Sequence, residues 1–517
     1  MLFRMRSLSH LILVFLSSQQ ASCFHVPHRT VSQQRRHLTF PVYMSSGENE
    51  RAQEVKVEVR SNKEDSKREM LRFAIPALGI FLSSPLLSNI DNAFVGRTVG
   101  AKGLAALSPA TICTDQMLYL FTFLSRATTG IVSRAYSRSD RSKEENIAAA
   151  QKAASAPLSV AIVSGLFLSI FYAFCTPKML ATLNVNPVLR KPAASYIYWR
   201  GAIAWAALAQ SVSLSIMLAT RDAISPLKII ALAAIVNVIG DALLCVYPLR
   251  WGCSGAAAAT AFATLFSSGF LLKDLSKKKL LPTIKLPSLA EFKELFDYVG
   301  PLFIITITRL VGFVSMQRQA MTLGVQSLAG YQVCVNTMIL FLLFGEPLSQ
   351  LFQTKLPALI DENRKDSIIR TIKSVSALAS YTALGIGTVS YLSLVLGTSF
   401  FTTDQVVQGI VQSTAPSVCI AIMAAILGVA VDGSLLASRD FGYITIVGIL
   451  SCILQLFLLK RCTTLNHIFL TFAFRLGTYF LAGVGRIALG GGALGRILKA
   501  KLVNGTKLSA SYETLTG

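Results

Sequence analysis

Long apolar stretches recur along most of this 517-residue chain, and they constrain its fold more than any other feature. A helix needs about 20 apolar residues to cross a bilayer core, and backbone groups in lipid must find their hydrogen-bond partners within such a helix. Only 15% of the residues are charged, whereas soluble proteins carry about 25%. The sequence therefore predicts an all-α polytopic membrane protein.

Twelve of these stretches are predicted to be transmembrane helices, arranged as two six-helix lobes. They cover residues 71–95, 104–133, 153–176, 193–220, 226–248 and 252–272 in a first lobe (70–272), and 298–320, 326–352, 371–396, 413–437, 441–461 and 465–489 in a second (298–490). Residues 273–297 are rich in Lys and contain two prolines, so we interpret them as a basic linker between the lobes.

The two lobes are related in sequence. LATRD (218–222) returns as LASRD (436–440), 218 residues later, and GAKGLAA (100–106) resembles GVQSLAG (324–330), 224 residues later. Two matches at nearly equal offsets indicate an internal duplication, which is typical of transporters with a central cavity between lobes. Connections after even-numbered spans carry roughly three times as many Lys and Arg as the others, which predicts both termini on the same, positive side.

The N-terminal region is predicted to be a targeting presequence, residues 1–47. Arg4 and Arg6 precede a short apolar core and a small-residue site at Cys23, as in a secretory signal, and an acid-free stretch with Arg and Ser follows, as in a transit peptide. The junction resembles bipartite presequences of algae with secondary plastids, although an ordinary signal peptide with a tail stays open. We expect the plastid envelope, or alternatively an endomembrane or the plasma membrane. Residues 48–69 are expected to be a flexible charged lead-in, and 491–517 a basic tail.

Several functional classes are excluded by composition and motifs. The formal charge of +23 resides in short loops, which indicates membrane topology and not nucleic-acid binding. The nine cysteines show no regular spacing, so neither a disulfide framework nor a cysteine metal site is predicted. No phosphate-binding loop of the G-x-x-x-x-G-K-[ST] type is present, which argues against an ATP-driven pump.

Polar residues interrupt the spans of the first lobe: Asp91 in LLSNIDNAFVG, Asn237 and Asp241 in IVNVIGDALLC, and Thr260 in GAAAATAFAT. Asn237 and Asp241 are four residues apart and share one helix face. An ionised Asp in mid-membrane costs roughly 2.5–3.5 kcal/mol, so we expect a function that offsets this cost. Together the four side chains offer oxygen ligands for a proton or a cation. The alternative is a structural role, in which Asn and Asp satisfy each other between helices.

These residues also carry a resemblance to the multidrug and toxic compound extrusion (MATE) family, in particular its DinF-like branch with plant plastid members. The matching segments are PLLSNIDNAFVG, LAALSPATICTDQMLYLFTFLSRATTG, NVIGDALLC, LATRDAISPLK, WGCSGAAAAT, FGEPLSQ and DGSLLASRDFGY. They extend over about residues 70–490. The resemblance implies two six-helix lobes, alternating access, and export of small organic solutes driven by inward H+ or Na+.

The resemblance also implies where the coupling ion binds. In DinF-like members a first-helix Asp, a fifth-helix Asn and Asp, and a sixth-helix Thr form the cation site, which here places it at Asp91, Asn237, Asp241 and Thr260. We expect no cofactor besides the coupling ion and no metal other than Na+. The chain is expected to be a monomer and not an enzyme.

Other polar residues in the spans are candidates for a substrate cavity: Arg126, Arg309, Glu346, Gln350 and Asp432. A buried Arg either pairs with a carboxylate or receives an anionic substrate, and the sequence leaves both open. Glu346 and Gln350, one turn apart, either contact substrate or stabilise a hinge. Arg126 stands where the family generally has an apolar residue, and Asn92 and Tyr331 replace its usual Thr and His.

Two other functions remain compatible with the sequence. A lipid-linked glycan flippase of the same superfamily would need a cationic groove for phosphate, for which Arg126, Arg200 and Arg309 are candidates. A membrane scaffold that transports nothing would not depend on the carboxylates inside the spans.

Overall fold

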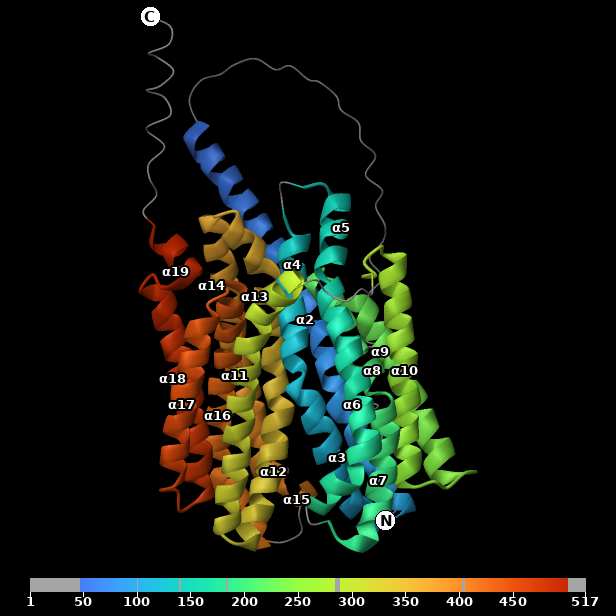
Figure 1. The fold of residues 1–517 in the computed structure, drawn as a ribbon. Coiled ribbons are helices and arrows are strands. Elements are labelled where there is room, and N and C mark those ends of the chain that lie inside the picture. The colour runs from blue at the N-terminus through green and yellow to red at the C-terminus, as the bar shows by residue number, and fades with distance from the viewer. Residues whose placement is uncertain are drawn as a thin grey trace, which may run out of the picture. The chain divides into compact units, whose positions relative to one another are not determined.

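The computed structural model of the chain describes residues 47–99, 101–138, 141–182, 185–283, 289–401 and 405–500. The chain divides into two compact units, Met1–Asn62 and Lys63–Gly517, and the fold below is that of the second unit. As predicted, the described residues are almost entirely helical. In Figure 1 the helices of this unit run side by side along a common direction, with the first half in blue to green and the second in yellow to red.

Each lobe consists of long helices and broken helix pairs, accompanied by short helices. The first contains α2 (Gly47–Thr98), α3 (Ala101–Leu120), α4 (Thr122–Tyr136), α5 (Lys143–Ala153), α6 (Ser155–Thr182), α7 (Pro187–Ala202), α8 (Ala204–Ala219), α9 (Ile224–Asp241), the π turn η1 (Ala242–Val246) and α10 (Cys253–Lys277). The second contains α11 (Leu289–Thr322), α12 (Val325–Leu342), the 3-10 turn η2 (Leu343–Gly345), α13 (Glu346–Asp361), α14 (Lys365–Leu396), α15 (Thr398–Phe401), α16 (Gln405–Ala437), α17 (Phe441–Leu459), α18 (Leu465–Ala488) and α19 (Gly492–Lys499).

Ten helical segments among the described residues are long and apolar enough to cross a membrane, and the pair α7–α8, bent by 50°, makes eleven. The predicted second span, 104–133, corresponds to α3 and α4, which are separated at Phe121. This pair is more polar because α4 lies inside the protein, where it carries Arg126 and buries Thr128 and Thr129. The predicted twelve-helix, two-lobe fold is therefore confirmed, with one span that faces protein more than lipid.

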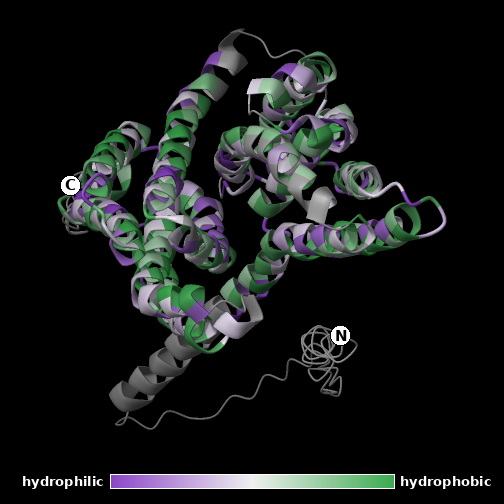
Figure 2. Ribbon diagram, turned by 90° about the horizontal axis from the view of Figure 1, so that it is seen from below, coloured by the Kyte–Doolittle hydropathy of each residue, from purple (hydrophilic) through white to green (hydrophobic). Residues whose placement is uncertain are grey.

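The outer surface of the helices is apolar. Large hydrophobic side chains such as Phe167 and Phe174 of α6, Tyr381 and Leu384 of α14, and Leu450 of α17 are exposed. Apolar residues also predominate on most helices when the molecule is viewed along them (Figure 2). Soluble monomers rarely expose apolar patches of this extent, whereas lipid tails cover them without cost.

Helix α4 joins the two lobes. It packs against α8 of its own lobe and against α11 and α13 of the second. One buried apolar cluster contains Leu124 and Leu208 from the first lobe together with Leu302 and Leu435 from the second. The lobes consequently belong to a single compact unit in this conformation.

Three boundaries differ from the sequence-based expectation. The lead-in 48–69 was predicted to be flexible but is helical within α2, because its Glu, Lys, Arg and Gln residues favour helices. The helices α10 and α11 extend into the linker 273–297 from both sides. The tail 491–517 contains the short helix α19, while residues 501–517 and residues 1–46 of the predicted presequence lie outside the described part of the chain.

Close packing of α6 on α8 depends on Gly165. A Cβ at this position would overlap the backbone of Trp205 and lie 2.8 Å from its nitrogen. Gly165→Ala should therefore lower the free energy of unfolding by roughly 1–3 kcal/mol, measured by thermal unfolding in detergent. Gly477→Ala is the matched control, because its Cβ would meet nothing within 4 Å, and it should be neutral or slightly stabilising. Equal effects of the two substitutions would contradict this packing.

Candidate functional site

The four polar residues predicted in the first lobe meet in one cluster, which we call the Asp91–Asp241 site. The amide of Asn237 donates to Asp91 Oδ1 at 3.0 Å and to Asp241 Oδ2 at 3.1 Å. Thr260 Oγ1 donates to the other oxygen of Asp91 at 3.0 Å. The site thus joins α2, α9 and α10, and Asp91, Asn237 and Asp241 are all buried.

Local backbone geometry brings Asp241 into this cluster. Helix α9 ends at Asp241 and continues as the π turn η1, a feature found frequently at functional sites. Gly240 lets α10 approach closely, since a Cβ there would lie 2.9 Å from the Cβ of Ala259. The thiol of Cys245, a weak donor, lies 3.9 Å from the remaining oxygen of Asp241, Oδ1. One carboxylate oxygen is therefore left with capacity for another ligand.

The chemistry of the Asp91–Asp241 site fits a proton or a monovalent cation. The two carboxyl groups lie within hydrogen-bonding reach of each other, so they repel when both are ionised, and a proton or Na+ between them removes the repulsion. The donor set is carboxylate, amide and hydroxyl oxygen, which suits a hard cation. In the described part of the chain, no group of three or more His, Cys, Asp and Glu side chains is placed to hold a metal ion.

A second cluster joins the lobes and contains four of the five residues predicted to line a substrate cavity. We call it the interlobe cluster: Arg126 of α4, Arg309 of α11, Glu346 of α13, Asp432 of α16 and Tyr479 of α18. Arg126 donates to Glu346 Oε1 and to Asp432 Oδ2, each at 3.1 Å. Arg309 donates to the same Asp432 oxygen at 2.7 Å, and the Tyr479 hydroxyl donates to Oδ1 at 2.7 Å. Of the two alternatives for these arginines, the structure shows pairing with carboxylates.

Gln350 does not join the interlobe cluster. Its side chain is buried, and its Oε1 has no hydrogen-bond partner among the described residues. Tyr331, one of the departures found in the sequence, is buried against the ring of Phe469 at 5.7 Å between ring centres. Both residues lie in the packed interior of the second lobe.

Further contacts of α4 with the second lobe lie nearer the Lys- and Arg-rich side. Ser133 Oγ donates to the carbonyl of Gln353 at 2.8 Å. Arg134 pairs with Asp361 at 2.5 Å and donates to the carbonyl of Ala437 at 2.8 Å. Polar contacts therefore hold the lobes together along much of α4 in this conformation.

Sequence reasoning missed a buried cation in the second lobe. Arg475 donates to Gln455 Oε1 at 2.8 Å and to the Thr308 carbonyl at 3.1 Å, and among the described residues it has no carboxylate partner. Gln455 follows Asn237 by 218 residues, which is the offset between LATRD and LASRD. Arg475 lies on α18, the repeat counterpart of α10, and Thr308 lies on α11, the repeat counterpart of α2. A fixed guanidinium thus occupies the region where the first lobe has two carboxylates. The isolated Arg in LTFAFRLGTYF was the signal that could have found it.

Comparisons with known proteins agree with this fold. Residues 76–243 match the family model described as MatE. The chain is 29% identical over 389 residues to Protein DETOXIFICATION 47, chloroplastic, of Arabidopsis thaliana, covering 74% of this chain and 70% of the relative. It is 24% identical over 215 residues to DNA damage-inducible protein F of Escherichia coli, covering 41% and 45%. A mutant of the Vibrio cholerae MATE transporter VcmN superposes with a TM-score of 0.70 at 16% identity, over 86% of this chain and 99% of that one.

The interlobe cluster should stabilise the observed conformation. Arg126→Gln is expected to lower the free energy of unfolding by roughly 1–3 kcal/mol, because Glu346 and Asp432 then lose a charged donor away from bulk water. Thermal unfolding in detergent, followed by tryptophan fluorescence, measures the loss. Combining Arg126→Gln with Glu346→Gln should give less than the sum of the single effects.

Arg318→Gln is the control for this double-mutant cycle. Arg318 lies on the same helix as Arg309 but is exposed, with no ion pair among the described residues, so its loss should change stability by less than about 0.5 kcal/mol. Strict additivity of the Arg126 and Glu346 substitutions would show that the pair contributes nothing.

Proposed function

We propose that this chain is a member of the multidrug and toxic compound extrusion family of secondary transporters, and that it exports a small organic solute in exchange for H+ or Na+ bound at Asp91 and Asp241. The observation that carries the proposal is the Asp91–Asp241 site itself. Two carboxyl groups are buried together inside membrane-spanning helices, held by an amide and a hydroxyl. Polar groups of this kind inside a membrane are costly and typically mark ion pathways.

The residues of the site would perform the coupling as follows. A proton or Na+ between Asp91 and Asp241 neutralises their repulsion and so favours the close packing of α2 on α9. Its release leaves two like charges, which the donors of Asn237 and Thr260 compensate in part, and this favours a looser arrangement of the same helices. Ion binding would in this way bias the lobe between two conformations, which is what antiport requires.

The interlobe cluster supports alternating access. Arg126 is the member from the first lobe, and its partners Glu346 and Asp432 belong to the second. For the lobes to separate on this side, these contacts and those of Arg134 must break. We propose that they close the pathway on the Lys- and Arg-rich side in the conformation seen here.

The pairing of the arginines argues against a lipid-linked glycan flippase. Such a protein needs cations available for a phosphate, whereas Arg126 and Arg309 are engaged by Glu346 and Asp432. Arg200 is likewise paired, with Asp115 at 2.9 Å. Antiport of an organic solute is therefore the better supported function.

We also propose that the protein acts as a monomer in the plastid envelope, with its Lys- and Arg-rich side facing the stroma. Two features support the location: the targeting character of residues 1–47 and the chloroplastic names of several relatives. Import into isolated plastids, followed by fractionation of the envelope, tests it.

Substrate efflux from proteoliposomes under an imposed pH gradient, and then under a Na+ gradient, tests the coupling. Organic cations and aromatic acids would serve as the substrate panel. Asp241→Asn and Asp91→Asn should each lower gradient-driven efflux roughly tenfold or more, because each removes a charged ligand worth more than about 1.4 kcal/mol.

Asp366→Asn provides the matched control, since Asp366 is an exposed carboxylate in the first turn of α14. Its efflux should equal that of the unmodified chain. Efflux that is indifferent both to the gradient and to Asp241 would make the carboxylate pair structural and refute the proposal.

A further inference from the structure

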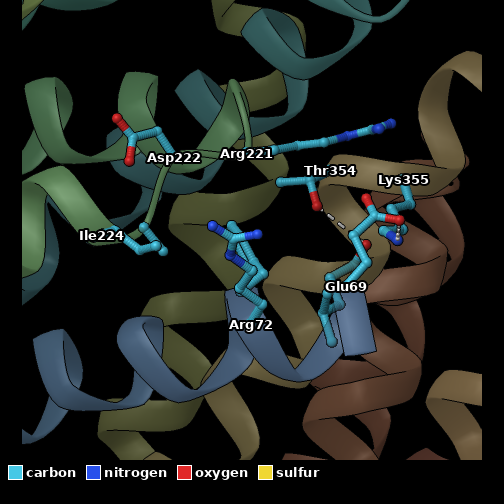
Figure 3. Close-up of a pocket in the computed structure, with 10 residues that line it drawn as sticks. Glu69, Arg72, Arg221, Asp222, Ile224, Thr354 and Lys355 are labelled. Atoms are coloured by element: carbon cyan, nitrogen blue, oxygen red, sulfur yellow. Dashed lines mark hydrogen bonds and ion pairs between the residues drawn. The ribbon is translucent and has the colours of Figure 1, made fainter. Parts of the chain in front are cut away.

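A basic cavity of about 300 Å³ lies between the two lobes, away from both clusters described above. Its charged lining residues come from three places: Glu69 and Arg72 from α2, Arg221 and Asp222 from the α8–α9 connection, and Lys355 from α13. In Figure 3, Glu69 and Arg72 point from α2 toward the side of the cavity formed by Arg221 and Lys355. The cavity lies on the Lys- and Arg-rich side, where α2 begins its apolar stretch.

The two acidic groups of the cavity are engaged by lysines. Glu69 pairs with Lys355 at 3.4 Å. Asp222 pairs with Lys278, outside the cavity, at 2.5 Å. Burial opposes the ionisation of Asp222, but hydrogen bonds from Lys278 and Ser225 outweigh it and hold its pKa below the ordinary value. Asp222 is therefore ionised at neutral pH and committed to Lys278.

Two guanidinium groups remain uncompensated. Arg72 and Arg221 both line the cavity; their side chains are exposed, and neither guanidinium has a hydrogen-bond or ion-pair partner among the described residues. A second cavity, of about 240 Å³, shares Arg221 and Lys355 and adds Arg364 together with Glu362, which pair at 3.6 Å. Guanidinium forks match the oxygens of phosphate, so arginines without a carboxylate partner that line a cavity suit an anion of this kind.

The backbone holds Arg221 in a defined direction. The Asp222 amide donates to the Met217 carbonyl at 3.0 Å and the Arg221 amide to the Leu218 carbonyl at 3.0 Å, which is a Schellman cap on α8. Arg221 has a φ of 64° at the position where Gly is usual, a conformation that L side chains adopt reluctantly. The cap fixes the direction of the Cα–Cβ bond, so the loop backbone need not become ordered when the side chain contacts a ligand.

We propose that this cavity binds a phosphate group, contacted by Arg72 and Arg221 and assisted by Lys355. Phe73, Ile224 and Leu351 supply apolar walls beside the charges. Phosphate in such a setting can come from the headgroup of an anionic lipid or from a soluble phosphate compound, and the recognition chemistry is the same. The site does not depend on the coupling chemistry proposed above.

Occupancy of the phosphate site has a conformational consequence. Arg72 and Arg221 belong to the first lobe and Lys355 to the second, so the ligand bridges both. The ligand binds only the conformation in which the two lobes are in contact on the Lys- and Arg-rich side. It therefore stabilises this conformation by mass action. Phosphate binding should therefore raise thermal stability and slow transport.

Thermal unfolding of the full chain tests the site with two probes. In detergent, inorganic phosphate is titrated against chloride at equal ionic strength; in nanodiscs, phosphatidylcholine alone is compared with phosphatidylcholine containing phosphatidylglycerol. We expect a saturable rise of the melting temperature with at least one probe. Arg72→Gln combined with Arg221→Gln should weaken the apparent affinity roughly tenfold or more, since two charged contacts are lost.

Arg439→Gln is the matched control. Arg439 is the repeat counterpart of Arg221, with a φ of 58° in the same type of cap, but it does not line the cavity. It should respond to phosphate as the unmodified chain does. The single variant Arg72→Gln, at an exposed position, replaces the double variant if the latter fails to fold, and should give a smaller loss of affinity.

The two probes separate the sources of the ligand. A response to inorganic phosphate alone supports a soluble phosphate compound, and a response to phosphatidylglycerol alone supports a lipid headgroup. No rise with either probe, or an equal rise in the double variant, overturns the proposal.

Discussion

The bilayer supplies no water to a polar side chain, and this constraint determines how every charge in the spans is placed. In the first lobe, the amide of Asn237 satisfies two carboxyl groups at once, because its two N–H bonds reach Asp91 and Asp241. The contact with Asp241 lies within α9, whereas the contact with Asp91 exists only while α2 and α9 are packed together. The hydrogen bonds of the Asp91–Asp241 site and the packing of α2 on α9 are therefore coupled properties of one lobe.

The internal repeat shows how the same constraint is met in two ways. Asn237 and its counterpart Gln455 both supply an amide between neighbouring helices, but Gln455 accepts from Arg475 where Asn237 donates to carboxylates. Gly312 leaves room for the guanidinium, since a Cβ there would overlap it. A permanent cation in the second lobe leaves no place for an exchangeable one at that position. The duplicated fold has thus kept its architecture while its lobes differ in electrostatics.

Much of this arrangement was predictable from the sequence, and the exceptions have physical reasons. The apolar stretches predicted the spans because their length is set by the bilayer, and the spacing of four placed Asn237 and Asp241 on one face. That Asp91 and Thr260 join them came from the family resemblance, because the packing of α2, α9 and α10 is not a local property. Residue spacing along the sequence could not show whether Arg126 and Arg309 pair with carboxylates, because those carboxylates lie on other helices. Arg475 was missed because its partners are an amide and a carbonyl, which leave no charge signature.

The arrangement of the interlobe cluster allows the lobes to part without stranding a buried charge. When Arg126 withdraws, Asp432 keeps Arg309 and Tyr479, both from its own lobe, so its charge stays compensated in the closed interior. Glu346 and Arg126 are then the groups that face the opened cleft, where water can hydrate them. Even in the closed arrangement the side chain of Glu346 is 25% exposed and that of Arg126 is 17% exposed. Removing a deeply buried charge from its only partner costs about 3–5 kcal/mol, whereas hydrating two partly exposed ions costs far less. The free energies of the two conformations can accordingly lie within the few kcal/mol over which ion and substrate binding can shift a population.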